Sequence, residues 1–225
     1  MKIAVIGGTG PQGRGLAMRW AQAGHEVVVG SRKPGRAADI AADLNERVGA
    51  VDHAIVGLGN ADAVAAVPEM VVVTVPYSAH VPTLESIRDQ LAGKILVDVT
   101  VPLAADNPKK MDMPPEGSAT EQAQALLGPD IPVVAAFQNL SAGALEAIDH
   151  PLHCDVLICG NSKAAKDKVI PLATALGCKA WNVGLAESAR CVESLTSLLI
   201  RLNIAKSYPD LKHAGISISG GVVHY

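Results

Sequence analysis

The stretch KIAVIGGTGPQGRG, residues 2–15, decides the fold, and EVVVGSRK, residues 26–33, follows it closely. A short apolar run leads directly into glycines, of which Gly8, Gly10 and Gly13 have the spacing G-x-G-x-x-G. Between a strand and a helix, the first such glycine permits a tight turn, the second lets the backbone approach a pyrophosphate, and the third lets helix and strand pack closely. A glycine turn without a ligand is the alternative. Strand, spacing and helix together favour a dinucleotide site.

The end of the second apolar run indicates which dinucleotide is bound. Sites for NAD usually place an acidic residue about 20 positions beyond the glycine loop, where it holds the ribose hydroxyls. This chain instead has Ser31, Arg32 and Lys33 there, followed by Arg36. Arginine binds phosphate bidentately and stacks on adenine. We therefore predict that the site takes NADP(H) through its 2′-phosphate; a solvated basic turn is the alternative.

Short apolar runs recur along the chain and alternate with Ala-rich helical segments. They are continuous rather than alternating in polarity, which is typical of parallel strands covered on both faces. The pattern predicts an α/β fold with a doubly wound parallel Rossmann sheet and a second, smaller C-terminal α/β domain. The runs that we expect to be strands of the first domain are residues 2–7, 26–30, 53–57, 70–75, 95–99 and 132–137.

The pattern changes near residue 140, so we expect residues 1–140 to bind NADP and residues 141–225 to form the substrate cleft and a dimer contact. The second part contains a predicted strand at 154–160, a helix at 163–176, a short strand around Trp181 and a long helix at 186–206. Residues 103–120 read as one long loop, placed where α/β proteins put ligand covers. The last helix has a polar stripe that we expect to face water, with a cleft-facing role as the alternative; its residues are Arg190, Glu193, Ser194, Ser197 and Arg201.

Composition limits the classes of protein to which the chain can belong. Hydrophobic residues make up 49% of its 225 residues, which is enough for a core, and the net charge of −3 with no basic block argues against nucleic acid. No apolar run approaches the length of roughly 20 residues that a membrane span needs, and the first apolar run does not have the pattern of a signal peptide. The four cysteines lack a disulfide or zinc spacing, so we expect reduced thiols in the cytoplasm, with Cys178 and Cys191 as small core residues.

Polar or proline residues follow three of the predicted strands, at the ends that border the crevice of such a sheet. These segments are Thr74–Ser78, Thr100–Pro102 and Ala136–Asn139. Their repetition favours a wall for the nicotinamide, although a proline also simply ends a strand. Asp98 is a candidate general base or a hydrogen-bonded strand-end carboxylate. The residues near His150 give no convincing metal site, and no acid–base pair stands out, so we assign no catalytic residue.

The sequence resembles the NADPH-dependent reductases of coenzyme F420, a deazaflavin, over nearly its whole length. The resemblance lies in the opening stretch to Lys33, in PVVAAFQNLSA (132–142), in CDVLICGN (154–161) and in RCVESLTSLLIRLN (190–203). The N-terminal module of membrane ferric reductases is also similar. The resemblance implies a Rossmann domain, a smaller C-terminal domain with the deazaflavin in the cleft between them, and a homodimer.

The resemblance also implies a set of ligand-binding positions. Hydride would pass between stacked nicotinamide and deazaflavin rings, so that catalysis is mainly positioning. The phosphates of NADP would lie on Thr9, Gly10, Pro11 and Gln12, and the 2′-phosphate on Ser31, Arg32 and Arg36. The nicotinamide half would be lined by Thr74, Pro76, Ser78, Val101 and Ala136, and the cleft side would include Gln138, Ser194 and Thr196.

One position departs from the family pattern. Where the family often has a histidine, this chain has Gln138, which can hydrogen-bond a ring carbonyl but cannot carry a proton. The departure leaves two further hypotheses open. One is an NADPH-dependent reductase of another acceptor, a flavin or a small carbonyl or imine. The other is a non-enzymatic NADP(H)-binding sensor.

Overall fold

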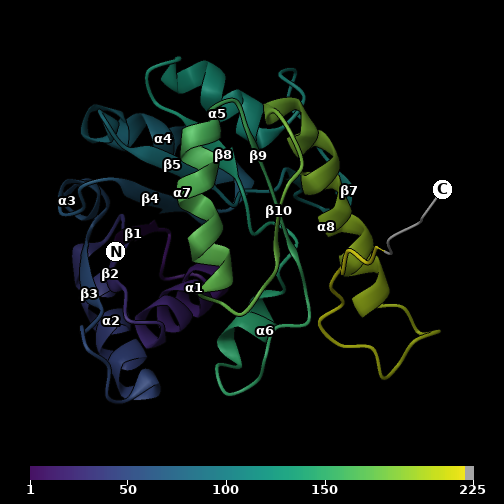
Figure 1. Cartoon of the computed structure of the whole chain (residues 1–225), viewed down its shortest axis with the longest axis horizontal. Helices are drawn as coiled ribbons and strands as arrows, with labels where there is room; N and C mark the ends of the chain where they lie inside the picture. Colours follow the sequence, from purple (N-terminus) through teal and green to yellow (C-terminus); the bar gives the residue numbers. More distant parts are fainter. Residues whose placement is uncertain (221–225) are drawn as a thin grey trace.

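The computed structural model describes residues 1–220 and shows one mixed sheet covered by helices on both faces (Figure 1). The strand order is β10-β9-β8-β5-β4-β1-β2-β3; β8 and β9 pair antiparallel, and the other neighbours pair parallel. The strands are β1 (Lys2–Ile6), β2 (Glu26–Ser31), β3 (Val56–Gly59), β4 (Met70–Val73), β5 (Ile95–Asp98), β8 (Val133–Ala135), β9 (Val156–Gly160) and β10 (Ala180–Asn182).

The helices follow the strands much as the sequence predicts, and most connect neighbouring parallel strands. They are α1 (Pro11–Gln22), α2 (Pro34–Val48), α3 (Asn60–Ala65), α4 (His80–Ile87), α5 (Ala119–Leu127), α6 (Ala142–Glu146), α7 (Lys163–Thr174) and α8 (Ala189–Asn203). Short 3-10 turns are η1 (Tyr77–Ala79), η2 (Arg88–Leu91) and η3 (Ala186–Ser188). Figure 1 shows α8 and the segment after it at one end of the molecule, away from β1–β3.

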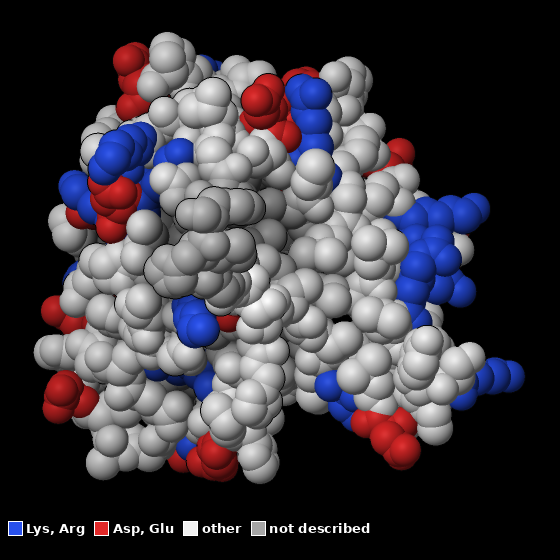
Figure 2. Space-filling view, turned by 45° about the vertical axis from the view of Figure 1, so that its right-hand side comes forward, with Lys and Arg blue, Asp and Glu red and all other residues white. Residues whose placement is uncertain are grey.

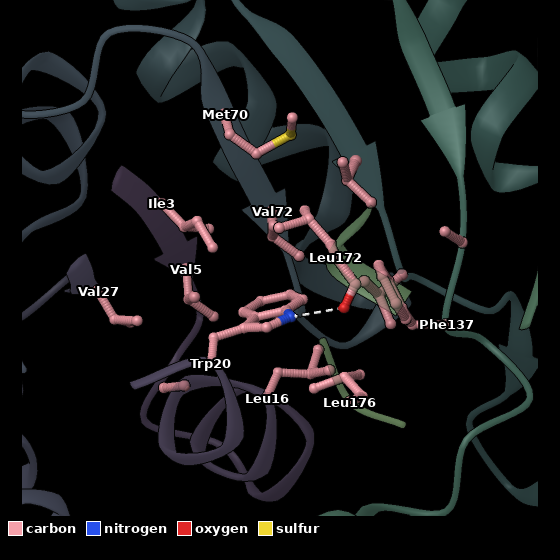
Figure 3. Packing of buried hydrophobic residues seen from close by; sticks show 14 of the residues in the cluster. Ile3, Val5, Leu16, Trp20, Val27, Met70, Val72, Phe137, Leu172 and Leu176 are labelled. Atoms are coloured by element: carbon pink, nitrogen blue, oxygen red, sulfur yellow. Dashed lines mark hydrogen bonds between the residues drawn. The ribbon is translucent and has the colours of Figure 1, made fainter. Parts of the chain in front are cut away.

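Side chains alternate between the two faces of the sheet and form two large cores, and a third, smaller cluster lies between β8, β9 and α8. In β1, Ile3 and Val5 pack under α1, α2 and α7, whereas Ala4 and Ile6 pack under α3, α4 and α5. In the first core, Trp20 donates its indole N–H to the carbonyl of Leu172 at 3.0 Å (Figure 3). Burial on both faces explains why the strands read as continuous apolar runs.

The sheet reverses its direction of winding between β1 and β4. From β1 the chain proceeds through β2 to β3, and from β4 it proceeds through β5 to β8 on the other side. The connections that leave the carboxyl ends of β1 and β4 therefore diverge, and a crevice opens between them. The residues that follow these two strand ends are the ones we expected to bind ligand.

The segment 103–120 is not the single loop we predicted. It contains an antiparallel hairpin of β6 (Leu103–Ala104) and β7 (Asn107–Met111), and α5 begins at Ala119. Its composition hides the hairpin, because Pro108, Lys109 and Lys110 are poor strand formers. The hairpin forms because β7 packs against α8: the Arg201 guanidinium donates to the carbonyl of Lys109 at 2.8 Å.

Two expectations about α8 and its cysteine were wrong. Glu193 is fully buried and Ser197 nearly so, whereas Arg190 and Arg201 of the same polar stripe are exposed. Cys191, expected in the core, is exposed, while Cys178 is buried as predicted. The helix turns its mixed face toward the protein because Glu193 finds hydrogen-bond donors there, which the polarity pattern of one helix cannot show.

β9 and β10 extend the same sheet beyond β8, so the part after residue 140 is joined to the first part through paired strands. The division into domains 1–140 and 141–225 stays a prediction, and residues 221–225 of the second lie outside the described residues. Within residues 1–220, no helix has the length and apolar character needed to cross a membrane.

Candidate functional site: a cavity from the glycine loop to helix α8

The loop after β1 is shaped by close backbone contacts. Gly7 has φ +77°, a conformation that favours glycine. A Cβ on Gly8 would lie 2.7 Å from the carbonyl oxygen of Val5, and one on Gly13 would lie 2.5 Å from the Cα of Gly8. A Cβ on Gly10 would have no neighbour closer than the carbonyl oxygen of Gly7 at 3.5 Å, so open space lies beside that glycine. Two of the motif glycines thus serve packing, and Gly10 leaves room for a ligand.

The first turn of α1 offers unpaired backbone donors to this space. The helix starts with Gly10 and Pro11, and within the described residues no side chain caps its first N–H groups. Such N–H groups, together with the partial positive charge of a helix N-terminus, bind phosphate. The loop therefore fits the pyrophosphate of a dinucleotide.

A cationic turn lies next to the loop at the end of β2. Ser31 is nearly buried, and its hydroxyl accepts a hydrogen bond from the backbone N–H of Lys33 at 3.2 Å. Arg32, Lys33 and Arg36 are exposed, and within residues 1–220 none of them forms an ion pair. This side-chain set fits a phosphate monoester, because guanidinium groups bind phosphate bidentately.

Both features open into one cavity of about 970 Å³ that continues to α8 and the chain after it. It brings together twelve of the seventeen expected positions: Thr9, Gly10, Pro11, Gln12, Ser31, Arg32, Arg36, Thr74, Pro76, Val101, Gln138 and Thr196. Five others are outside its lining. Gly8 and Gly13 pack beneath the loop, Ala136 is fully buried, Ser78 is exposed in η1, and Ser194 bonds to the carbonyl of Arg190 at 2.6 Å.

Sequence reasoning missed several lining residues. Asn60 directly follows the end of β3, so the strand-end rule that singled out Thr74 could have found it. Asn203 and Ala214 had no such signal. They line the cavity because the Asn203 side chain accepts a hydrogen bond from the N–H of Ala214 at 2.7 Å, which holds the chain after α8 against the site.

Three hydrogen bonds fix the centre of the cavity. The Gln138 side-chain amide donates to the carbonyl of Asp98 at 2.8 Å, and the Thr196 hydroxyl donates to the carbonyl of Gln138 at 2.9 Å. Gln12 of the glycine loop donates to the carbonyl of Phe137 at 3.2 Å. Phe137 has φ +73°, which is unfavourable for a bulky residue, and its ring is held by an edge-to-face contact with Trp20. This turn links the glycine loop to α8.

A buried ionic pair lies behind this centre. His80 Nε2 is 2.8 Å from Asp98 Oδ2, and both side chains are fully buried. Asp98 Oδ1 accepts a hydrogen bond from the N–H of Thr100 at 3.0 Å. Burial lowers the pKa of His80, but the charge of Asp98 and the hydrogen bond to it outweigh burial, and the net pKa is raised. Asp98 is thus a bonded strand-end carboxylate, closed off from ligand, rather than a general base.

Glu193 joins α8 to the start of α5. Its carboxylate accepts hydrogen bonds from the N–H of Ala119 at 2.8 Å, the N–H of Thr120 at 3.0 Å and the Thr120 hydroxyl at 2.8 Å. Burial is the main cause that raises the pKa of Glu193 to about 7, and the negative charge of Asp98 is the second. The glutamate of the VESLT segment therefore serves as an anchor, and Thr196 of the same segment is the residue that reaches the cavity.

Within the described residues, the cavity lining holds no carboxylate and no imidazole. Its polar groups are hydroxyls, side-chain amides, backbone groups and the cations of the β2 turn. Such a lining can bind and orient two ligands, but offers no strong general acid or base. It suits a reaction in which positioning contributes most, such as hydride transfer between two bound rings.

Comparisons with known proteins place the chain among reductases. Residues 2–102 match the family model for NADP oxidoreductase, coenzyme F420-dependent. The F420-dependent NADP reductase of Methanothermobacter thermautotrophicus is 43% identical over 225 residues, covering 97% of this chain and 95% of that protein. That of Methanocaldococcus jannaschii is 41% identical over 210 residues, covering 91% and 93%. A crystal structure of a putative F420-dependent NADP reductase from Arthrobacter sp. FB24 has a TM-score of 0.82 at 27% identity, covering 98% of this chain and 100% of that one.

Proposed function

This chain belongs to the family of coenzyme F420-dependent NADP reductases, and we propose that it is an oxidoreductase that transfers a hydride between NADP(H) and the deazaflavin coenzyme F420. The observation that carries the proposal is the single cavity that joins the glycine loop and the cationic turn to α8. Curated relatives above 40% identity favour this enzyme over a reductase of another acceptor and over a non-enzymatic sensor.

The residues divide the binding of NADP(H) between them. The unpaired N–H groups of the first turn of α1, after Pro11, take the pyrophosphate, while Ser31, Arg32 and Arg36 take the 2′-phosphate. The nicotinamide half is assigned to the strand ends after β4 and β5, at Thr74, Pro76, Ser78 and Val101, with Ala136 beneath. This assignment is supported by the cavity lining for all of these except Ser78 and Ala136.

The deazaflavin is assigned to the other half of the cavity, between the chain after β8 and helix α8. Gln138, Thr196 and Leu140 line this half, and Ser194 lies one turn after Arg190 on the same helix. When both co-substrates are bound, the hydride passes directly between their rings. The chain contributes by holding the two ring sites rigidly, through the bonds from Thr196 to Gln138 and from Gln138 to Asp98.

The proposal also covers the domain division and the assembly. We assign NADP binding to residues 1–140, and the co-substrate side and the dimer contact to residues 141–225. We propose a homodimer because the outer face of α8 carries two exposed leucines, Leu198 at 54% and Leu202 at 39%. We propose a cytoplasmic location because the four cysteines are free. Exposed leucines on one helix face are typical of surfaces that pair.

The test of the proposed function is a single-turnover reaction. The protein is mixed with NADPH and oxidised coenzyme F420 under anaerobic conditions, and the deazaflavin absorption band is followed. We expect the band to bleach as NADPH is consumed in equal amount. Binding of NADPH without any bleaching would overturn the proposal.

A further inference from the structure

One carboxamide side chain of the cavity lining is left unused by the fold. The lining carboxamides are those of Gln12, Asn60, Gln138, Asn139 and Asn203. Gln12, Gln138 and Asn139 donate to backbone carbonyls at 3.2, 2.8 and 2.7 Å, and Asn203 accepts from a backbone N–H at 2.7 Å. The Asn60 oxygen, in contrast, is buried and has no hydrogen-bond partner within residues 1–220, and over the same residues its NH2 group forms no hydrogen bond either.

Burial makes the missing partner of Asn60 significant. The residue is only 8% exposed, so its carboxamide lies in the wall of the cavity rather than on the open surface. Buried polar atoms in folded proteins nearly always have a partner, because losing water without gaining a hydrogen bond is unfavourable. Asn60 is the first residue of α3, and no side chain caps that helix. A partner from a ligand in the cavity would therefore complete this side chain.

The end of β3 places Asn60 beside the turn assigned to the 2′-phosphate. Gly59, the residue before it, lies next to Ser31 in the parallel pairing of β2 and β3. A Cβ on Gly30 would lie 3.1 Å from Asn60 Oδ1, so the carboxamide rests against the end of β2. Neighbouring strands are about 5 Å apart. A sugar whose phosphate is held at Ser31 therefore comes within reach of Asn60.

Long-range charge does not decide which parts of a nucleotide are recognised. The net charge of the chain is −3, and Figure 2 shows basic and acidic side chains both spread over the α8 side of the molecule. Recognition therefore depends on short-range contacts inside the cavity. There the cations of the β2 turn suit the phosphate, which leaves the adenosine sugar and base to neutral groups such as Asn60.

We propose that the Asn60 carboxamide binds the adenosine ribose of NADP(H), at the 3′-hydroxyl next to the 2′-phosphate. The inference rests on the proposed function in that NADP(H) occupies this end of the cavity. A hydroxyl both donates and accepts, so it fits either end of a carboxamide that no protein hydrogen bond holds in one orientation. The ionised phosphate only accepts, and it already has Ser31 and the three cations. Asn60 thus contacts a part of the cofactor that NADPH and NADH share.

The test measures dissociation constants by isothermal titration calorimetry in the absence of the second co-substrate. Asn60→Ala removes the carboxamide, whereas Asn60→Asp keeps an acceptor and adds a negative charge. Asn182→Ala is the matched control, because Asn182 is exposed in β10, at the opposite edge of the sheet from β3. The ligands are NADPH, NADH and deamino-NADPH, in which an oxo group replaces the adenine amino group.

For Asn60→Ala we expect the dissociation constants of all three ligands to rise by the same factor, about three- to tenfold, because one neutral hydrogen bond is lost. For Asn60→Asp we expect that of NADPH to rise more than about tenfold, since a carboxylate repels the adjacent phosphate. That of NADH stays within about twofold, since a carboxylate accepts from ribose hydroxyls. Asn182→Ala keeps all three constants. The urea midpoint of Asn60→Ala is unchanged or higher, because no protein hydrogen bond is removed.

Several results would overturn the ribose contact. Weaker binding of NADPH alone in Asn60→Ala would assign the side chain to the phosphate, and a loss that disappears with deamino-NADPH would assign it to the adenine amino group. Unchanged constants, or a lower urea midpoint that shows the protein itself uses the side chain, would also overturn it. Binding of NADPH by the unmodified protein without hydride transfer to coenzyme F420 would overturn the proposed function and leave the ribose contact standing, whereas absence of binding would overturn both.

Discussion

Replacing Glu193 by glutamine changes how the stability of the protein depends on pH. The carboxyl group is fully buried, accepts three hydrogen bonds at the start of α5, and has its pKa raised from 4.5 to about 7. Between these two values the folded protein holds a proton that the unfolded chain has released. Stability from this group is therefore complete below about pH 4.5 and is lost as pH rises through about 7.

The size of the effect follows from the two pKa values. Each pKa unit corresponds to about 1.4 kcal/mol, so the full contribution is roughly 3.4 kcal/mol, of which about 2.5 kcal/mol is lost between pH 5 and pH 8. Glutamine cannot ionise, so the Glu193→Gln variant lacks this loss. Its amide leaves one of the α5 donors without an acceptor, which costs about 1–3 kcal/mol at every pH.

The measurement is urea unfolding at several pH values between 5 and 8, at constant protein concentration, followed by the fluorescence of Trp20 and Trp181. We expect the free energy of unfolding of Glu193→Gln, relative to the unmodified protein, to rise by about 2.5 kcal/mol from pH 5 to pH 8. Glu121→Gln is the control at the same helix start. The hydrogen bond from Arg190 lowers the pKa of Glu121, so that this group stays ionised over the whole range. Parallel pH profiles for Glu193→Gln and the unmodified protein would refute the reasoning.

Three further predictions concern the two ligand sites. Arg32→Ala is expected to raise KM for NADPH about 10- to 100-fold, because a charged hydrogen bond is lost, and to raise KM for NADH less than about threefold. An equal rise of both KM values in steady-state assays would contradict the role assigned to the β2 turn. Gly13→Ala, whose Cβ would meet the Cα of Gly8 at 2.5 Å, should lower the free energy of unfolding in urea by about 1–3 kcal/mol, and an unchanged midpoint would contradict it. Thr196→Val removes the bond to Gln138 and should raise KM for coenzyme F420 about fivefold with KM for NADPH unchanged; a change in both would place Thr196 elsewhere in the mechanism.

The parts of the fold that sequence predicts well are those in which local pattern and tertiary environment agree. Parallel strands buried on both faces must be apolar throughout, so β1, β2, β4 and β5 can be recognised from composition alone. The strand-end rule then assigns Thr74 and Val101 to the crevice, and both residues line the cavity.

The features that sequence did not reveal depend on partners far along the chain. The β6–β7 hairpin has poor strand formers and is held by Arg201, 92 residues from the carbonyl it binds. Glu193 resembles any solvated glutamate of an amphipathic helix, and only its bonds to Ala119 and Thr120 explain its burial. Residues such as these are decided by tertiary contacts that local propensity does not encode.

Gln138, the departure from the family pattern, has its side chain fixed by a hydrogen bond. Its side-chain amide is oriented by the carbonyl of Asp98, which can only accept, so the amide nitrogen must face that carbonyl and the side-chain oxygen must face the other way. That oxygen is buried and has no hydrogen-bond partner among the described residues. A histidine at this position would bring a titration near neutral pH, and glutamine brings none. Burial raises the pKa of Tyr77, so this phenol of the cavity lining stays neutral near pH 7.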